Sequence, residues 1–555
     1  MSIRFAAGGK TIFRAIARFG GWFIFILTIT ASLYQVLTVH HELFDPNETI
    51  LRIGHWQLEL GYRSAIQDII DDYEKLQWDK FHRRIKIIQM PVAQTIFDSW
   101  LATHLISGDA PDIFEMGYSP LVTQQRYIGR YLSPLTHEVE TPNPYNAGTS
   151  LADVPWQQTL IDGMHSGYWP DLQDFYGIPT SMINNRMFFN RDLLKEATGS
   201  DQPPDTFGKL LAACQEIRQL GERKGTPITP IAGSSYNEGI FLTRYAVAFT
   251  SSYEPVLDVT LDGGITARQT YMGFCRGKVG FDDPRVRAFY QCMKTLCDQF
   301  GVGFYSEDRQ TAAFKFVEGR AAMLATGPWD TETLFRQTQG KFRLGIMGFP
   351  LPAPGEKWGQ YIAGDVNEAN KAGACVYGVN KQSPNHDLAI DFLRFMTSQS
   401  HNADLNEKAQ WLPITIGAKP SPLMQAFMPN SQGYSSFVTF PYGSYGTTVY
   451  DGQLQRYLQG EITYEQFSAD VADALKNPDA GGDHAWAQEY DDAKRNCRSL
   501  ERILQTRAVF MLMDPTSAED ARKFRRSLSQ QIGFNNGELY RYQYQQLFGK
   551  PIPPP

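Results

Sequence analysis

Three short apolar stretches with helical patterns between them decide the fold: LRIGHW at residues 51–56, RIKIIQM at 84–90 and DIFEM at 112–116. Each has the length and the apolar content of a buried or half-buried strand. The two segments between them space their apolar residues three and four positions apart, as an amphipathic helix does. Strands that alternate with helices in this way are typical of βαβ units and of a mostly parallel sheet. The sequence therefore predicts an α/β fold.

The same alternation continues through the middle of the chain. Apolar spacing predicts helices over residues 192–198, 207–220, 283–300 and 386–398. From residue 484 the composition changes, because two strongly charged segments with helical spacing follow, at 484–512 and 517–532. We therefore expect residues 484–555 to form a helical extension of the α/β part.

An uncharged segment near the N-terminus indicates a membrane. Residues 20–39 contain no charged side chain, and the first acidic residue is Glu42. About 20 apolar residues in a helix cross the hydrocarbon core of a bilayer. Because Arg4, Lys10, Arg14 and Arg18 precede the segment, residues 1–19 are predicted as a cytoplasmic leader. The chain after His40 is then expected on the periplasmic or extracellular side of a bacterial cytoplasmic membrane.

Two interpretations of residues 20–39 stay open, a retained single-pass anchor and a cleaved signal peptide. A signal peptide has a shorter apolar region and a small-x-small cleavage site. The best such site is Thr30-Ala31-Ser32, which lies inside the apolar segment rather than after it. The first cysteine is Cys214, so no cysteine near this segment can carry a lipid. The retained anchor is the favoured interpretation.

Composition restricts the class of protein. With 42% hydrophobic and 20% charged residues, the 555-residue chain has the balance of an ordinary globular protein of two or three domains. Its net charge of −7 gives no general attraction to nucleic acid. Six cysteines are too few for a disulfide scaffold, although an oxidising exterior would permit a bond from Cys275 to Cys292 or Cys297. No CxxC pair is present, which disfavours a zinc site.

Six motifs then follow one another in a familiar order: GDAPD at 108–112, YGIP at 176–179, FFNRDLL at 188–194, PPDTF at 203–207, FVEGRAAM at 316–323 and GPW at 327–329. Each is weak alone, but together they resemble the bacterial extracellular solute-binding proteins, the maltose-binding-protein-like sugar-binding proteins of ABC importers. The resemblance covers about residues 51–480. The chain departs from it by lacking the usual lipid-carrying cysteine and by adding the C-terminal extension.

The resemblance implies the two-lobed, type II fold of periplasmic binding proteins. Lobe 1 would contain residues 51–178 and 358–408, and lobe 2 residues 182–350 and 410–480. The hinge crossings between them would fall near residues 176–184, 348–358 and 405–412. The ligand would bind between the lobes and shift the population toward a closed state, because only that state contacts the ligand from both sides.

A carbohydrate site needs a flat aromatic surface for the sugar's C–H face and a complete set of polar partners for its hydroxyls. An unpaired buried polar group costs about 1–3 kcal/mol, and aromatic side chains supply apolar area with little conformational freedom to lose. Nine residues at expected strand ends, in loops or near a crossing are candidate ligand contacts: Trp329, Trp56, Tyr236, Asn237, Tyr118, Glu115, Asp365, Trp411 and Asp330.

Trp329 is the strongest candidate, since it matches the family tryptophan that the resemblance assigns to sugar stacking. Structural roles stay open for several others. Trp56 has an equal claim to packing against the following helix, and Trp411 to covering the hinge. For Asp330, capping of the helix that begins at Thr331 is the favoured role. The sequence contains no recognisable catalytic motif, no metal-ligand cluster and no cofactor signature.

The sequence therefore predicts a membrane-anchored extracytoplasmic protein that captures a carbohydrate, with an oligosaccharide favoured, and presents it to the permease subunits of an ABC importer. It is predicted not to be an enzyme. Two alternatives from other classes remain, a ligand-sensing partner of a membrane receptor kinase and, with less support, an extracytoplasmic glycan hydrolase.

Overall fold

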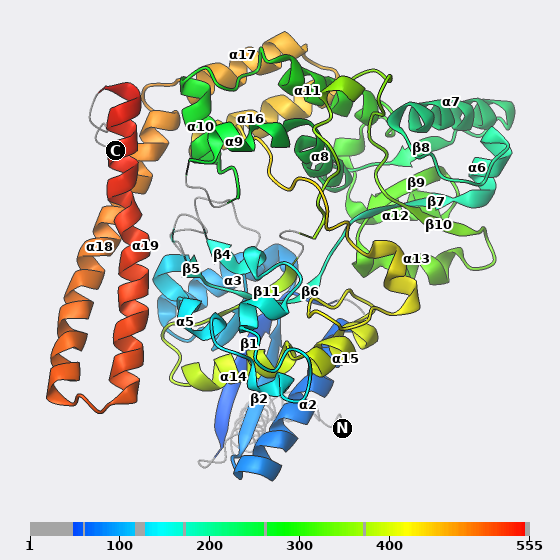
Figure 1. The fold of residues 1–555 in the computed structure, drawn as a ribbon. Helices are drawn as coiled ribbons and strands as arrows, with labels where there is room; N and C mark the ends of the chain where they lie inside the picture. Colours follow the sequence, from blue (N-terminus) through cyan, green and yellow to red (C-terminus); the bar gives the residue numbers. More distant parts are fainter. Residues whose placement is uncertain are drawn as a thin grey trace, which may run out of the picture. The chain divides into compact units, whose positions relative to one another are not determined.

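A computed structural model of the chain describes residues 48–58, 61–116, 128–169, 172, 174–259, 263–369 and 373–549 (Figure 1). The segment at residues 20–39, predicted to span the membrane, lies outside these ranges. Within the ranges, no helix is both long and apolar enough to cross a bilayer.

The described residues fall into two compact units. The first, which comprises residues up to Leu51 and Ile70–Ile88, contains the start of β1 (Thr49–His55), the end of α2 (Tyr62–Phe81) and the first half of β2 (Ile85–Pro91). Within it, the Thr49 N–H donates to the Arg84 carbonyl at 2.9 Å and the Ile87 N–H to Glu74 Oε1 at 2.7 Å. The second unit comprises Arg52–Ile69 and Gln89–Pro555.

A five-stranded sheet has the order β2-β1-β3-β11-β6, with β3 at Ile113–Glu115, β11 at Gly373–Val379 and β6 at Ile178–Met182. The three strands predicted from the opening motifs are thus confirmed. β1 and β3 are parallel, with Ile53 opposite Ile113. β11 is antiparallel to both of its neighbours, so β6 runs in the same direction as β1 and β3, and β11 is the reversed strand among these four. β11 is reversed because the chain reaches it from the other sheet, and it therefore enters this sheet from the opposite end.

Helices α3 (Gln94–Ser107), α5 (Thr136–Val139), α14 (His386–Met396) and α15 (Gln399–Ala409) accompany this sheet, together with a small hairpin of β4 (Tyr168–Trp169) and β5 (Asp174–Phe175). A core of fully buried apolar side chains lies between α3 and β3: Phe97, Leu101, Phe114, Leu132 and Tyr176. We call this part of the second unit lobe 1.

A four-stranded sheet has the order β10-β7-β9-β8, with β10 at Leu344–Met347, β7 at Arg186–Asn190, β9 at Ala321–Thr326 and β8 at Thr229–Ala232. We call the part around it lobe 2. Its helices are α6 (Arg191–Thr198), α7 (Phe207–Arg223), α8 (Ser235–Thr250), α9 (Glu254–Leu257), α10 (Ala267–Cys275), α11 (Pro284–Cys297), α12 (Arg309–Val317), α13 (Thr331–Thr338), α16 (Gly443–Gln459) and α17 (Tyr464–Leu475). The helices predicted from apolar spacing correspond to α6, α7, α11 and, in lobe 1, α14.

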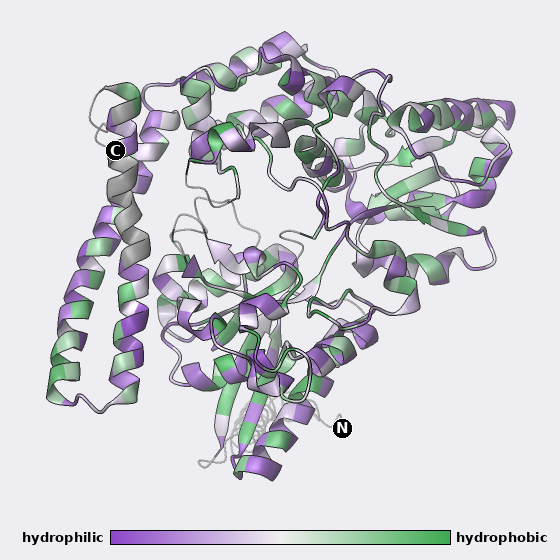
Figure 2. Ribbon diagram, viewed as in Figure 1, coloured by the Kyte–Doolittle hydropathy of each residue, from purple (hydrophilic) through white to green (hydrophobic). Residues whose placement is uncertain are grey.

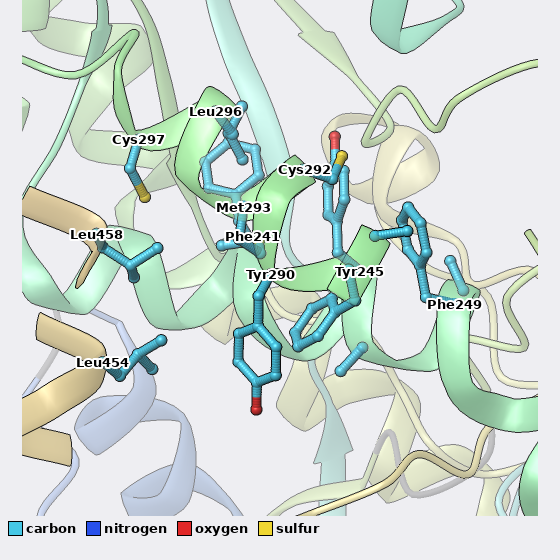
Figure 3. Close-up of a cluster of buried hydrophobic side chains, with 14 of the residues drawn as sticks. Phe241, Tyr245, Phe249, Tyr290, Cys292, Met293, Leu296, Cys297, Leu454 and Leu458 are labelled. Carbon is cyan, nitrogen blue, oxygen red and sulfur yellow. The ribbon is translucent and has the colours of Figure 1, made fainter. Parts of the chain in front are cut away.

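Helix starts in lobe 2 follow from local sequence. The side chains of Asn190, Thr206 and Asp283 each accept a hydrogen bond from a backbone N–H in the first turn of the helix that follows them. Phe241, Tyr245 and Phe249 of α8 belong to a buried cluster that also contains Tyr290, Cys292, Met293 and Leu296 of α11 and Leu454 and Leu458 of α16 (Figure 3). This core fixes α8, which carries part of the candidate site.

The chain passes between the two sheets after β6, after β10 and after α15. Trp358 and Val366 still pack in the lobe 2 core, so the second passage follows Val366 and lies later than the predicted 348–358. Leu412 still pairs with Met182 of β6, whereas Phe427 packs against Phe188 of β7 at 5.8 Å between ring centres. The third passage therefore lies between residues 412 and 427, also later than predicted.

The C-terminal extension is helical, as predicted. Helices α18 (Gly482–Met513) and α19 (Ala518–Phe548) lie side by side as an antiparallel pair, orange and red in Figure 1. Figure 2 shows hydrophilic and hydrophobic residues interspersed along α18 and along the coloured parts of α19. We call this pair the C-terminal hairpin. The six cysteines, all of them in the described ranges, form no disulfide.

Candidate functional site

The candidate site lies at one edge of the lobe 2 sheet, where two parallel strands end. β8 and β9 are parallel neighbours, with Ile231 opposite Met323. Their carboxyl ends therefore meet, and ligands of α/β proteins bind at such edges. β8 leads through Gly233 and Ser234 into α8. β9 leads through Gly327 into a short 3₁₀ turn, Pro328–Asp330.

Two aromatic side chains face each other at this edge. The ring centres of Tyr236 and Trp329 are 6.4 Å apart at an interplanar angle of 71°. Tyr236 is 38% exposed, while Trp329 is partly buried and lies over Gly327. A Cβ atom at position 327 would lie 2.2 Å from the Trp329 ring, so this ring position requires a glycine there. The edge thus presents a rigid aromatic surface.

Polar groups border the aromatic pair. The Arg309 guanidinium lies 5.4 Å from the centre of the Tyr236 ring and 3.6 Å from the Asp330 carboxylate. Asp330 also accepts a 2.6 Å hydrogen bond from the Thr326 hydroxyl. Its side chain makes no capping bond to α13, so the predicted helix cap at Asp330 is wrong. The carboxylate instead joins the end of β9 to α12.

Two donors beside the pair have no partner among the described residues, the Trp329 indole N–H and the Thr331 hydroxyl. Both atoms are inaccessible to bulk water, where polar groups are nearly always hydrogen-bonded. A hydroxylated ligand or an ordered water at this edge would supply what they lack.

Other candidates in lobe 2 and at the third crossing have structural contacts. Asn237 is fully buried and donates from Nδ2 to the Ala325 carbonyl at 2.8 Å, which fastens α8 to β9. Trp411 is 5% exposed and packs on Tyr62 at 4.9 Å. Asp365 is exposed, and its carbonyl accepts from the Tyr434 N–H at 2.9 Å. None of these three side chains lies in the group formed by Tyr236, Trp329 and Asp330.

A second edge, in lobe 1, contains the remaining candidates. Trp56 follows β1 and packs edge-on against Phe97 at 5.1 Å. Glu115, at the end of β3, is fully buried and accepts from the Trp56 N–H at 3.3 Å and from Gln57 Nε2. The two parallel strands thus bring Trp56 and Glu115 together at one edge of the sheet. Tyr118 lies outside the described residues.

Sequence reasoning missed Arg309 and Gln57. Arg309 lies in the first turn of α12, some twenty residues from Trp329 and more than seventy from Tyr236, so no local pattern links them. Gln57 follows Trp56 directly and could have been found as a polar residue at a strand end. In the described ranges, no group of His, Cys, Asp or Glu is arranged to hold a metal ion.

Two α/β lobes joined by three passages, with aromatic side chains at strand edges, define a binding protein of the two-lobed class. A family model for bacterial extracellular solute-binding proteins matches residues 68–428. The chain belongs to this family. Its members are binding proteins rather than enzymes, and they work in the periplasm or outside the cell. The relationship confirms the resemblance found in the motifs.

Individual relatives are distant. The sn-glycerol-3-phosphate-binding periplasmic protein UgpB of Pectobacterium atrosepticum is 19% identical over 360 residues, which are 64% of this chain and 72% of the relative. A solved chitin oligosaccharide binding protein is 17% identical with a TM-score of 0.54, covering 77% of this chain and 98% of its own. RafE from Streptococcus pneumoniae, in its apo form, is 14% identical with a TM-score of 0.53 and the same coverage. These likenesses support the two-lobed fold.

Proposed function

We propose that this protein captures an oligosaccharide outside the cytoplasm and presents it to the permease subunits of an ABC importer. The observation that carries the proposal is the Tyr236–Trp329 pair at the carboxyl edge of β8 and β9, with unsatisfied donors beside it. The family and the names of its structural relatives, among them a chitin oligosaccharide binding protein and a maltose-bound MalE3, support a sugar as the ligand.

The chemistry of the edge suits a neutral sugar. A pyranose ring can place its C–H face on the indole of Trp329 while a hydroxyl donates to the Asp330 carboxylate. Trp56, at the matching edge of lobe 1, would contact the ligand from the other lobe. Closing of the lobes would then complete the site, because only the closed state offers both sets of contacts.

A phosphorylated polyol is the competing ligand class, since one relative is named for binding sn-glycerol 3-phosphate. Arg309, which lies over the Tyr236 ring, is a cation that could attract such a ligand. Its charge is already balanced by Asp330 at 3.6 Å, and the pair is neutral as a whole. This balance favours an uncharged sugar.

A thermal-shift screen tests the ligand class. The folded part, from residue 48, is heated with chitotriose, xylotriose, maltotriose, raffinose and sn-glycerol 3-phosphate at millimolar concentration. Binding raises the Tm through RT ln(1 + [L]/Kd), so a ligand present at 100 times its Kd stabilises the protein by about 2.7 kcal/mol. We expect at least one neutral oligosaccharide to do this. A shift with glycerol phosphate alone would contradict the proposed ligand class.

We also propose that residues 20–39 hold the protein on the membrane as a retained anchor. Full-length protein should fractionate with membranes and resist extraction by high salt, whereas a form with a cleavable signal peptide in place of residues 1–39 should be soluble in the periplasm. Mass spectrometry of the native N-terminus distinguishes the anchor from a cleaved signal peptide. Loss of the first 30 or so residues would contradict the anchor.

A further inference from the structure

The start of the C-terminal hairpin is built into lobe 2. Trp486 of α18 is fully buried between Tyr271 of α10, at 6.5 Å between ring centres, and Tyr544 of α19, at 5.4 Å. One turn later, Glu489 accepts a 2.7 Å charged hydrogen bond from Arg268, and both side chains are at most 15% exposed. This end of the hairpin is therefore part of the lobe 2 core.

The middle of the same hairpin contacts lobe 1. Arg526 of α19 donates from Nε and Nη2 to Glu138 Oε1 of α5, at 3.1 and 2.9 Å, with both side chains at most 15% exposed. Ser529 donates to the Asp174 carboxylate of β5, and Gln530 Nε2 donates to the Gly129 carbonyl.

An apolar contact accompanies these polar ones. Leu500 of α18 is 4% exposed and belongs to the lobe 1 core with Ile128 and Leu172. One rigid element thus contacts the cores of both lobes.

A rigid element in contact with both lobes constrains any rotation of one lobe against the other. Two α-helices that pack along their length cannot stretch, because their backbone hydrogen bonds fix the rise per residue. When the lobes turn about their three passages, one set of hairpin contacts must therefore slide or break. The lobe 2 set contains a fully buried tryptophan and continues directly from α17. The lobe 1 set is mainly polar, and hydrogen bonds between side chains are lost after a shift of about 1 Å. The lobe 1 contacts are the ones that give way.

We propose that the C-terminal hairpin is a brace that opposes closing of the lobes, so that ligand binding has to detach α19 from lobe 1. The inference rests on the proposed function and adds regulation of the same site. A ligand that binds only the detached state has an apparent Kd equal to its intrinsic Kd divided by the fraction of molecules in which the brace is released. Removing the lobe 1 contacts should therefore tighten binding, whereas locking them should abolish it.

Release is tested with the triple variant Arg526→Ala, Ser529→Ala and Gln530→Ala. The matched control is Arg495→Ala on α18, because Arg495 is exposed and its ion pairs to Asp491 and Asp492 stay within one helix. Spin labels at exposed positions of each lobe, Thr103→Cys and Lys195→Cys, report the distance between lobes. We expect the triple variant to broaden the distance distribution without any ligand. We also expect it to bind maltotriose or chitotriose about three- to tenfold more tightly, equivalent to about 0.7–1.4 kcal/mol.

Locking is tested with the pair Ser529→Cys and Asp174→Cys, whose short side chains are in contact in the native protein. Under oxidising conditions the disulfide should abolish binding of the same trisaccharides, and a reductant should restore it. The single variant Ser529→Cys, treated in the same way, controls for oxidation of the native cysteines.

The outcomes separate this inference from the proposed function. If no oligosaccharide binds the wild-type protein, the proposed function fails, and the distance distributions of the triple and control variants still decide whether the hairpin restrains the lobes. If a trisaccharide binds the wild-type protein and the oxidised disulfide variant equally well, the brace is wrong. An unchanged or weaker affinity in a correctly folded triple variant would overturn it as well.

Discussion

Arg186 holds both carboxylate oxygens of Glu368, with Nη1 3.0 Å from Oε1 and Nη2 2.9 Å from Oε2. Arg186 begins β7, directly after the first passage between the lobes, and Glu368 lies on the second passage. The third passage joins them, because Arg186 also donates to the carbonyls of Ala426 and Met428. Arg244 of α8 lies 3.1 Å from Glu368. A single carboxylate therefore links all three passages to the helix that carries Tyr236.

Replacing Glu368 should destabilise lobe 2. Burial alone would raise the pKa of this carboxyl, but Arg244 and Arg186 outweigh it and hold the pKa below its ordinary value. Glu368→Gln keeps the shape of the side chain and leaves two buried arginines without a counter-charge. We expect a loss of about 3 kcal/mol in the free energy of unfolding, measured by urea denaturation.

The matched control for Glu368 is Asp192→Asn, which removes an exposed ion pair to Arg343. Exposed pairs contribute about 0–1 kcal/mol, so this variant should unfold close to the wild type. Equal losses in both variants would show that burial of the Glu368 group has no special effect on stability.

Trp329→Ala should weaken oligosaccharide binding at least tenfold, or about 1.4 kcal/mol, because it removes the larger half of the aromatic surface. Isothermal titration measures the change, and circular dichroism checks the fold. Trp78→Ala is the matched control, since Trp78 is 48% exposed on α2 and belongs to the other compact unit. Unchanged affinity in a folded Trp329 variant would remove this residue from the site.

Two neighbours on α8 should separate binding from stability. Tyr236→Ala removes an exposed ring of the aromatic pair, so we expect weaker oligosaccharide binding with little change in Tm. Asn237→Ala leaves the Ala325 carbonyl without its 2.8 Å donor in a fully buried place. An unsatisfied buried group of this kind costs about 1–3 kcal/mol, so Asn237→Ala should mainly lower the free energy of unfolding. If Asn237→Ala weakened binding and Tyr236→Ala lowered stability instead, Asn237 rather than Tyr236 would contact the sugar.

The buried carboxyl of Glu238 should make stability depend on pH. Burial raises the pKa of Glu238 from 4.5 to about 7, although the Tyr305 hydroxyl donates to it and partly opposes the rise. The folded protein therefore binds this proton more tightly than the unfolded chain does. The associated stability is fully present below pH 4.5 and is lost as pH rises through 7, by about 3 kcal/mol in total.

Glu238→Gln removes this titration and tests it directly. As pH rises from 5 to 8, the free energy of unfolding of the variant should increase relative to that of the wild type. A difference that is the same at both pH values would mean that Glu238 does not titrate in this range.

Local sequence predicted much of the fold. The opening strands, the helices at α6, α7, α11 and α14, and the helical extension all follow from apolar spacing, because burial of one face acts within a single element. The motif order predicted the family. Strand direction in β11 and the positions of the later passages were not predictable in this way, since they depend on which sheet a segment joins. Trp358, for example, looked like the start of lobe 1 but packs in the lobe 2 core.

The sequence by itself determined which segments are strands or helices, the family, and the aromatic candidates for the site. Each of these follows from the composition and the spacing of residues. Only the tertiary structure decided which candidates lie together. It placed Tyr236 beside Trp329, brought Arg309 to Tyr236 and Asp330, and buried Asn237 and Trp411 in structural contacts. It also showed one hairpin contacting both lobes. The physical reason is that neighbours across a sheet edge or between two helices come from distant parts of the chain. Which residues become neighbours depends on strand order and helix packing, and these depend on interactions along the whole chain.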